Sequence, residues 1–160
     1  MSGVRQMWAQ VDRQCVIKAN AQFWEQMLAM TFDATLNPEE SCVEAGHIVG
    51  SVNLSGEWKG LIEVRIAGGL AYTATAAMMM QPVESVVEAD ALDATREIAN
   101  MIAGTIKSSL PRPCRMAVPE SAVGLARFCG SAQTKDSLVV GFRHASGDLM
   151  VRVWEHECLQ

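Results

Sequence analysis

Three residues within eight positions, Glu97, Asn100 and Gly104, form the pattern most suggestive of chemistry. They lie in the stretch TREIANMIAGTIKSSLP, whose apolar spacing predicts the end of a long helix. At about 100° per residue, the acid, the amide and the bare glycine fall within roughly 60° of Glu97 and share one helical face. A carboxylate and an amide one turn apart on a surface are free to act together.

This face is open to two interpretations. Any amphipathic helix has a polar side, so an acid and an amide three positions apart are compatible with an ordinary solvated surface. Gly104 favours a functional site, because a glycine inside a helix costs about 1 kcal/mol relative to alanine and an exposed position has no packing demand that requires one. We expect a partner protein to approach the backbone there and dock over Asn100. We assign Asp93, Met101 and Gly104 to this partner-binding surface, while Asp93 and Asp90 also complement the positive end of the helix.

The other elements follow from apolar periodicity and from glycine and proline breaks. The order of elements predicts an α+β fold, an antiparallel sheet with long helices packed on one face, in a single domain over residues 1–160. The three consecutive methionines at 78–80 are interpreted as core filler, because helix neighbours point about 100° apart and cannot converge on a metal ion. The predicted helices are 17–32, 70–80 and one from 86 or 90 to 110; the predicted strands are 41–54, a half-buried 58–66 after a turn at 55–57, 114–118, 126–130, 137–144 and 148–155.

Composition excludes several classes of protein. The 160 residues are 49% hydrophobic and 19% charged, the balance of a protein with a well-filled core. A formal net charge of -5 argues against a nucleic-acid partner, which needs a basic face. No segment is apolar enough for a signal peptide or a membrane span, so we expect a cytoplasmic protein with no membrane partner.

No metal site and no second catalytic centre is expected. The five cysteines are odd in number and scattered, which is typical of reduced thiols. His156 and Cys158 lie too close to the end of the sequence and are too few for a tetrahedral zinc site. His47 and His144 have no neighbouring acid or nucleophile in sequence and are interpreted as structural or solvated.

The string ExxNMIAG at residues 97–104 resembles the signature helix of the CheC, CheX and FliY family of chemotaxis phosphatases. In that family ExxN is followed by a small-residue turn and glycine. The likeness extends upstream through GLIEV at 60–64 and the helix at 71–80, and weakly downstream through the closing hairpin, so that it spans about residues 50 to 155. Thr105 stands where the family often has asparagine, but on the flank toward the core.

The number of motifs distinguishes the branches of the family. The CheC branch has two ExxN motifs per chain, whereas the helix around Phe23 has Glu25 followed by Leu28 where the amide should be. The chain is therefore similar to CheX, and this likeness implies a homodimer with one site in each subunit.

The resemblance implies hydrolysis of the aspartyl phosphate on a CheY-type response regulator. Asn100 would orient the attacking water, since a carboxamide can accept from and donate to one water without adding charge. Glu97 would pair with a lysine of the regulator. The regulator would carry the Mg²⁺, so the chain needs no cofactor of its own. The alternative is a non-catalytic module of the same fold that binds a response regulator or serves as a flagellar-switch-like component.

Overall fold

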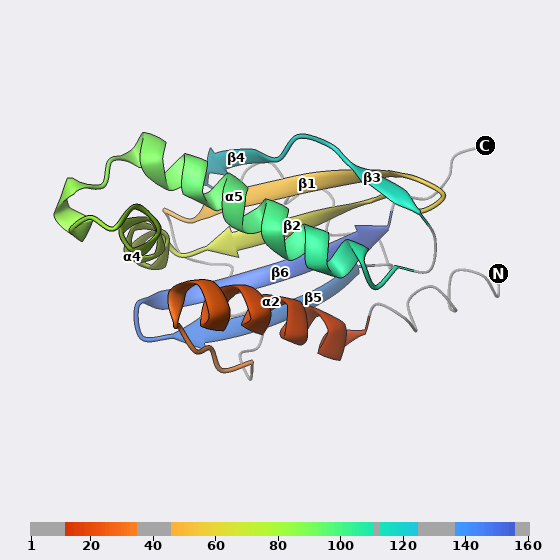
Figure 1. Cartoon of the computed structure of the whole chain (residues 1–160), viewed down its shortest axis with the longest axis horizontal. Coiled ribbons are helices and arrows are strands. Elements are labelled where there is room, and N and C mark those ends of the chain that lie inside the picture. Colours follow the sequence, from red (N-terminus) through yellow and green to blue (C-terminus); the bar gives the residue numbers. More distant parts are fainter. Residues whose placement is uncertain (1–11, 35–45, 111–112, 125–136, 156–160) are drawn as a thin grey trace.

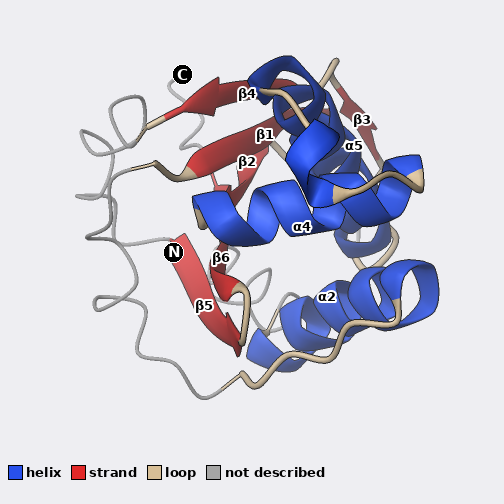
Figure 2. Ribbon diagram, turned by 90° about the vertical axis from the view of Figure 1, so that its left-hand side faces the viewer, coloured by secondary structure: helices blue, strands red, loops and turns tan. Residues whose placement is uncertain are grey.

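A six-stranded antiparallel sheet carries helices on one face (Figures 1 and 2). The computed structural model describes residues 12–34, 46–110, 113–124 and 137–155, and every structural statement concerns these ranges. The strand order is β3-β1-β2-β6-β5, and β4 pairs with β1 beside β3. The elements are α2 Arg13–Leu28, β1 Ile48–Gly56, β2 Gly60–Ile66, α4 Gly68–Met79, the 3-10 turn η1 Val83–Ser85, α5 Glu88–Lys107, β3 Cys114–Met116, β4 Glu120–Val123, β5 Ser137–His144 and β6 Gly147–Glu155.

The core lies between the helices and one face of the sheet. Alternate residues of the central strands point toward the helices, because side chains in a strand alternate between faces and register aligns those of neighbouring strands. Val52 is opposite Ile62, and Ile62 is opposite Val153, so one apolar row crosses three strands. The fold class predicted from the sequence, an antiparallel sheet with helices on one face, is confirmed.

Strand β2 is buried on both faces, whereas its alternating sequence predicted a half-buried strand. Glu63 and Arg65 are only 1% and 4% exposed, and their side chains form an ion pair with each other. β2 lies between β1 and β6, and Arg152 of β6 is the register neighbour of Glu63. The alternation identified the polar face correctly but could not show that paired charges on a central strand are also removed from water.

Helix α2 begins and ends about four residues before the predicted bounds of 17–32. Asp12 caps its first turn by accepting from the Cys15 N–H at 2.9 Å. Ala29, with φ 53, ends the helix in a left-handed turn. The apolar pattern ran on because Met30 and Phe32, which lie beyond the helix, still pack against the core.

The interpretation of the methionine run at 78–80 as core filler is wrong for its last two residues. Helix α4 ends at Met79, and the capping residue Met80 is in a left-handed conformation with φ 54. Met79 is 39% exposed and Met80 is 93% exposed, while Met78 is partly buried against the core. Apolar periodicity could not predict the exposure of Met79 and Met80, because it does not show where a left-handed cap ends the helix and turns the chain away from the core.

The C-terminal half matches the prediction more closely. Helix α5 begins between the two predicted starts and ends at Lys107, after which short backbone bonds turn the chain as far as Leu110. The hairpin of β5 and β6 is confirmed, with its turn at Ala145 and Ser146. Strand β1 continues to Gly56, so the connection to β2 lies at residues 57–59 rather than at the predicted 55–57, and β3 ends two residues early. β4 was not predicted, and the strand predicted at 126–130 lies outside the described residues.

Candidate functional site

Helix α5 has one buried and one exposed side, as its sequence predicted. The buried side packs on the sheet and on the other helices through Ala91, Ala94, Thr95, Ile98, Ala99, Ile102, Ala103 and Ile106. On the opposite side Glu97 is exposed, and Asn100, Met101 and Gly104 are partly exposed. In Figure 1 this helix crosses in front of the sheet, and we call its outer side, which faces away from the sheet, the ridge of α5.

The start of α5 is fixed by a local cap. The Val87 N–H donates to the Asp90 carboxylate at 3.3 Å, which satisfies one of the unpaired donors of the first turn. Glu88 adds a second acid to that turn, where negative charge complements the helix dipole. The predicted role of Asp90 at the helix start is thereby confirmed.

Glu97 and Asn100 are neighbours on the ridge and have no partner within the described part of the chain. Residues three apart on a helix have Cβ atoms about 5–6 Å from each other, so both side chains can reach one external group. No described residue forms a hydrogen bond or ion pair with either side chain. Both functional groups are therefore available to a molecule that docks on α5.

Gly104 lies one turn beyond Asn100, where the fold does not require a glycine. A Cβ built there would have the Met116 Sδ as its nearest neighbour, at 4.0 Å, which is an ordinary contact. Gly50 of β1 presents the opposite case, because a Cβ there would meet the Thr95 carbonyl oxygen at 2.7 Å. Packing within the chain explains Gly50 and leaves Gly104 unexplained.

Two further predicted surface residues are engaged within the chain. Asp93 is ion-paired with Arg96 one turn along the helix, and 69% of its side chain remains exposed. Met101 is partly buried against the hydrophobic core. Neither contact tests the predicted partner-binding role of these residues, which stays a prediction.

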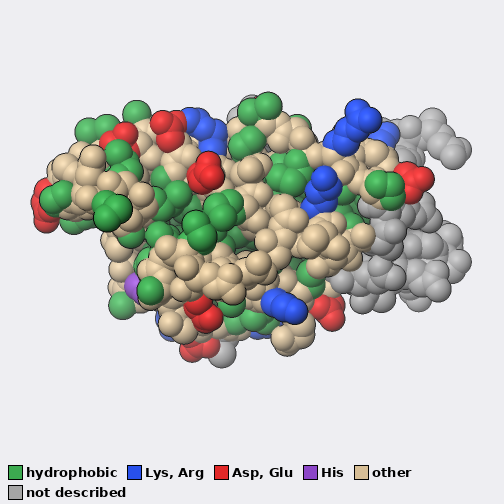
Figure 3. Space-filling view, viewed as in Figure 1, with side chains coloured by type: hydrophobic (Ala, Val, Ile, Leu, Met, Phe, Trp, Pro, Cys, Tyr) green, Lys and Arg blue, Asp and Glu red, His purple; other side chains and the backbone are tan. Residues whose placement is uncertain are grey.

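Charge is distributed unevenly along the helix. Figure 3 shows Asp and Glu side chains near the end of the molecule where α5 begins, and Lys and Arg side chains near the end where it stops. At that second end burial raises the pKa of the Cys114 thiol, and the positive charge of Lys107 partly opposes this shift. Arg115, in the adjacent strand β3, is exposed.

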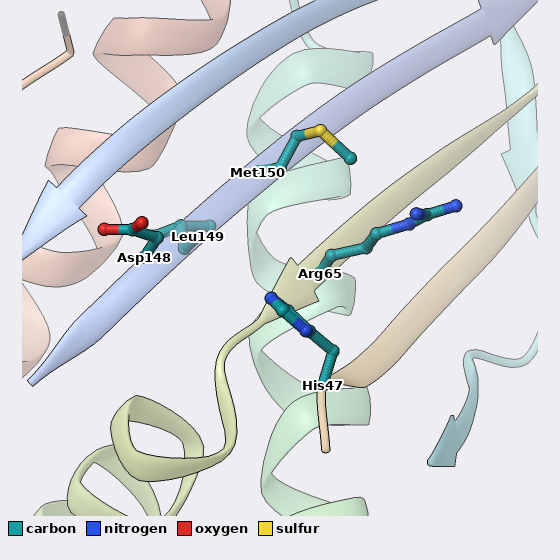
Figure 4. Close-up of a pocket in the computed structure, with 5 residues that line it drawn as sticks. All are labelled: His47, Arg65, Asp148, Leu149 and Met150. Carbon is teal, nitrogen blue, oxygen red and sulfur yellow. The ribbon is translucent and has the colours of Figure 1, made fainter. Parts of the chain in front are cut away.

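Two hollows in the described part of the chain contain no residue of α5. One, drawn in Figure 4, has no room for a water molecule; its side chains of His47, Arg65 and Met150 lie in front of the sheet, on the side away from α5. The other is an open hollow of about 620 Å³ beside His144, whose Nδ1 accepts from the Ser146 N–H and whose ring packs on Phe32. Both histidines are thus integrated in the fold. Within the described ranges no group of three His, Cys, Asp or Glu side chains could hold a metal ion.

The sequence matches one known protein family. The family model described as chemotaxis phosphatase CheX matches residues 48–143, more than half of the chain, including the whole of α5. The chain belongs to the CheX family. No curated protein matches the sequence.

Solved structures related to CheX have the same fold as this CheX-family chain. A CheC-like superfamily protein from Shewanella sp. PV-4 is similar with a TM-score of 0.73 and 18% identity, over 90% of this chain and 96% of that one. CheX from Vibrio vulnificus is similar with a TM-score of 0.71 and 17% identity, over 90% and 95% of the two chains. The CheX–CheY–BeF3–Mg²⁺ complex from Borrelia burgdorferi is similar with a TM-score of 0.70 and 14% identity, over 90% and 97%. No described helix of this CheX-family chain is long and apolar enough to cross a bilayer.

Proposed function

We propose that this member of the CheX family hydrolyses the aspartyl phosphate of a CheY-type response regulator with Glu97 and Asn100. The observation that carries the proposal is the unpartnered acid–amide pair on the exposed ridge of α5. The complex of the Borrelia burgdorferi relative with CheY supports a partner of this class. A protein-sized substrate also suits an exposed helix face that lines neither of the two hollows, because small ligands usually bind in concave pockets.

Asn100 orients the attacking water. Hydrolysis of an acyl phosphate adds water at phosphorus and releases the aspartate carboxylate together with inorganic phosphate, so a water must lie in line with the P–O bond that breaks. The carboxamide oxygen accepts a hydrogen bond from that water, and the amide nitrogen can donate to it or to a phosphoryl oxygen. Because the carboxamide is neutral, it adds no negative charge beside the phosphoryl group.

Glu97 sets the depth and angle at which α5 enters the regulator. Its carboxylate pairs with a lysine of the regulator, one turn of helix before Asn100. The Mg²⁺ that neutralises the phosphoryl oxygens belongs to the regulator and comes with the substrate. Asp93, Met101 and Gly104 border the contact, and the bare backbone at Gly104 admits a loop of the partner. We further propose a cytoplasmic homodimer with one such site in each subunit.

The test is phosphate release from a CheY-type regulator phosphorylated with acetyl phosphate in Mg²⁺. Asn100→Ala is expected to lower the rate by about 10² to 10³, the usual effect of removing one group positioned for the transition state. Asn53→Ala is the matched control, because Asn53 is an exposed amide on β1. An Asn100→Ala protein that hydrolyses at the wild-type rate would contradict the assignment.

Glu97 is tested by binding rather than by rate. Glu97→Ala is expected to weaken the complex with the BeF3⁻-activated regulator by up to about 2 to 5 kcal/mol if the charge pair is buried in the contact. Glu97→Gln separates charge from shape and is expected to lose most of the same affinity. Tight binding without hydrolysis by the wild-type protein would instead favour a non-catalytic, flagellar-switch-like binding module.

A further inference from the structure

A polar contact joins α5 to the edge strand β4 immediately beside the site. Arg96 Nη1 donates to the Ser121 hydroxyl at 3.2 Å, and the same hydroxyl donates to the Leu92 carbonyl oxygen at 2.9 Å. We call these three residues, Leu92, Arg96 and Ser121, the α5–β4 clamp. Figure 1 shows β4 running beside the first half of α5. Arg96 directly precedes Glu97, so the clamp holds the helix within one turn of both proposed site residues.

The clamp lies beside a close approach of α5 to the sheet. Ser121 is the register neighbour of Gly50 in β1. A Cβ on Gly50 would lie 2.7 Å from the Thr95 carbonyl oxygen and 2.9 Å from the Ala99 Cβ. Gly50 therefore sets the distance between helix and sheet, while the two directional hydrogen bonds of Ser121 restrict rotation of the helix about its own axis.

Small rotations of α5 matter because the side chains that act are far from its axis. With side chains, a helix has a radius of about 5–6 Å, so a rotation of about 10° moves the tip of an outward side chain by about 1 Å. A misplacement of about 1 Å can lower the rate of a positioned reaction by about 10². Near the site the buried face of α5 combines small alanines with the fully buried Ile98 and Ile102. Packing of this face therefore sets the rotation of the helix coarsely, and the hydrogen bonds of Ser121 restrict it further.

We propose that Ser121 and Arg96 are positioning residues, which lock the rotation of α5 and thereby aim Asn100 at the water. This inference rests on the proposed phosphatase function. Neither residue touches the substrate; each acts through the orientation of the helix that carries Glu97 and Asn100. The surface ion pair of Arg96 with Asp93 holds the guanidinium in the plane that reaches Ser121.

The kinetic test compares Ser121→Ala with Ser121→Thr, which keeps the hydroxyl, and with the control Ser55→Ala, an exposed serine on β1. Ser121→Ala is expected to lower kcat at least tenfold and to raise Kd for the BeF3⁻-activated regulator less than Glu97→Ala does, and Ser121→Thr is expected to restore most of kcat. In an Asn100→Ala background, Ser121→Ala is expected to have no further effect on the residual rate, while its effect on Tm persists. A purely structural role predicts the same loss in both backgrounds, and that result would overturn the proposal.

A second readout does not depend on hydrolysis. The ¹H–¹⁵N signals of the Asn100 side-chain amide, identified by their loss in Asn100→Ala, are expected to shift or broaden in Ser121→Ala and to return in Ser121→Thr. Arg96→Lys provides a second variant if Ser121→Ala folds poorly, because an ammonium cannot reproduce the planar contacts of the guanidinium. Unchanged Asn100 signals in both variants would overturn the clamp. If the wild-type protein releases no phosphate, the proposed function fails, and these signals alone decide whether the clamp orients α5.

Discussion

Replacing Gly104 by alanine should stabilise the fold and weaken the complex with the regulator. A glycine in a helix interior costs about 1 kcal/mol relative to alanine. Of the described atoms the new methyl group would meet only the Met116 Sδ, at 4.0 Å, so the described fold accepts it without strain. For a chain of this size 1 kcal/mol corresponds to a rise in Tm of about 2–4 °C.

The same methyl group should obstruct the partner. If a loop of the regulator packs on the bare backbone at Gly104, one additional methyl group overpacks the contact at a cost of typically about 1–3 kcal/mol. This corresponds to a roughly 5- to 150-fold increase in Kd at 25 °C. Stability and binding are then expected to change in opposite directions, which global damage to the fold would not produce.

Calorimetry of the free protein and titration of the BeF3⁻-activated regulator measure the two effects. Gly50→Ala is the matched control, because its Cβ would lie 2.7 Å from the Thr95 carbonyl oxygen and should lower Tm. If Gly104→Ala lowers Tm, the packing argument is wrong. If it raises Tm and leaves Kd unchanged, the partner does not approach the backbone at Gly104.

Two further predictions concern the fold that supports the site. The fully buried Trp24 donates to Asn20 at 2.9 Å, so Asn20→Ala should lower the free energy of unfolding by about 1–3 kcal/mol, measured by urea denaturation. Burial raises the pKa of the Cys114 thiol, so its contribution to stability is fully present below the usual thiol pKa of about 8.5 and is lost as pH rises through the raised value. The difference in unfolding free energy between wild type and Cys114→Ala should therefore decrease from pH 7 to pH 10, and a constant difference would contradict the shift.

The helices and long strands were predictable wherever one periodicity extended over many residues. α5 shows this best, because its apolar side and its exposed side are both as expected. The ends of helices and strands, and the contacts between distant residues, were less predictable. The four-residue strand β4 is too short for a periodic signal, and Ser121, which contacts α5 from β4, has no motif that would single it out. Only the tertiary structure brings Arg96 and Ser121, 25 positions apart, into contact.

The burial of charged side chains also could not be predicted from the alternating sequence pattern. An alternating strand reads as half exposed, yet Glu63 and Arg65 of β2 are almost completely buried as a pair. The cost of removing two charges from water is offset only when each has a partner. Periodicity contains no information on that pairing, because it depends on the position of β2 in the middle of the sheet.

Glycines show how structure separates a functional irregularity from a packing requirement. Gly50 and Gly60 lie in strands, and Gly104 lies in a helix, so by sequence alone all three violate local propensity. A Cβ on Gly50 would collide with α5, and one on Gly60 would collide with Trp58, so packing within the chain accounts for both. Among the described residues Gly104 has no such neighbour. A residue that breaks a local rule without any gain inside its own chain is expected where function imposes the exception, and Gly104 lies one turn from Asn100 on the same exposed ridge. We therefore propose that the requirement for glycine comes from a partner, and for that reason the binding arm of the Gly104→Ala experiment is more decisive than its stability arm.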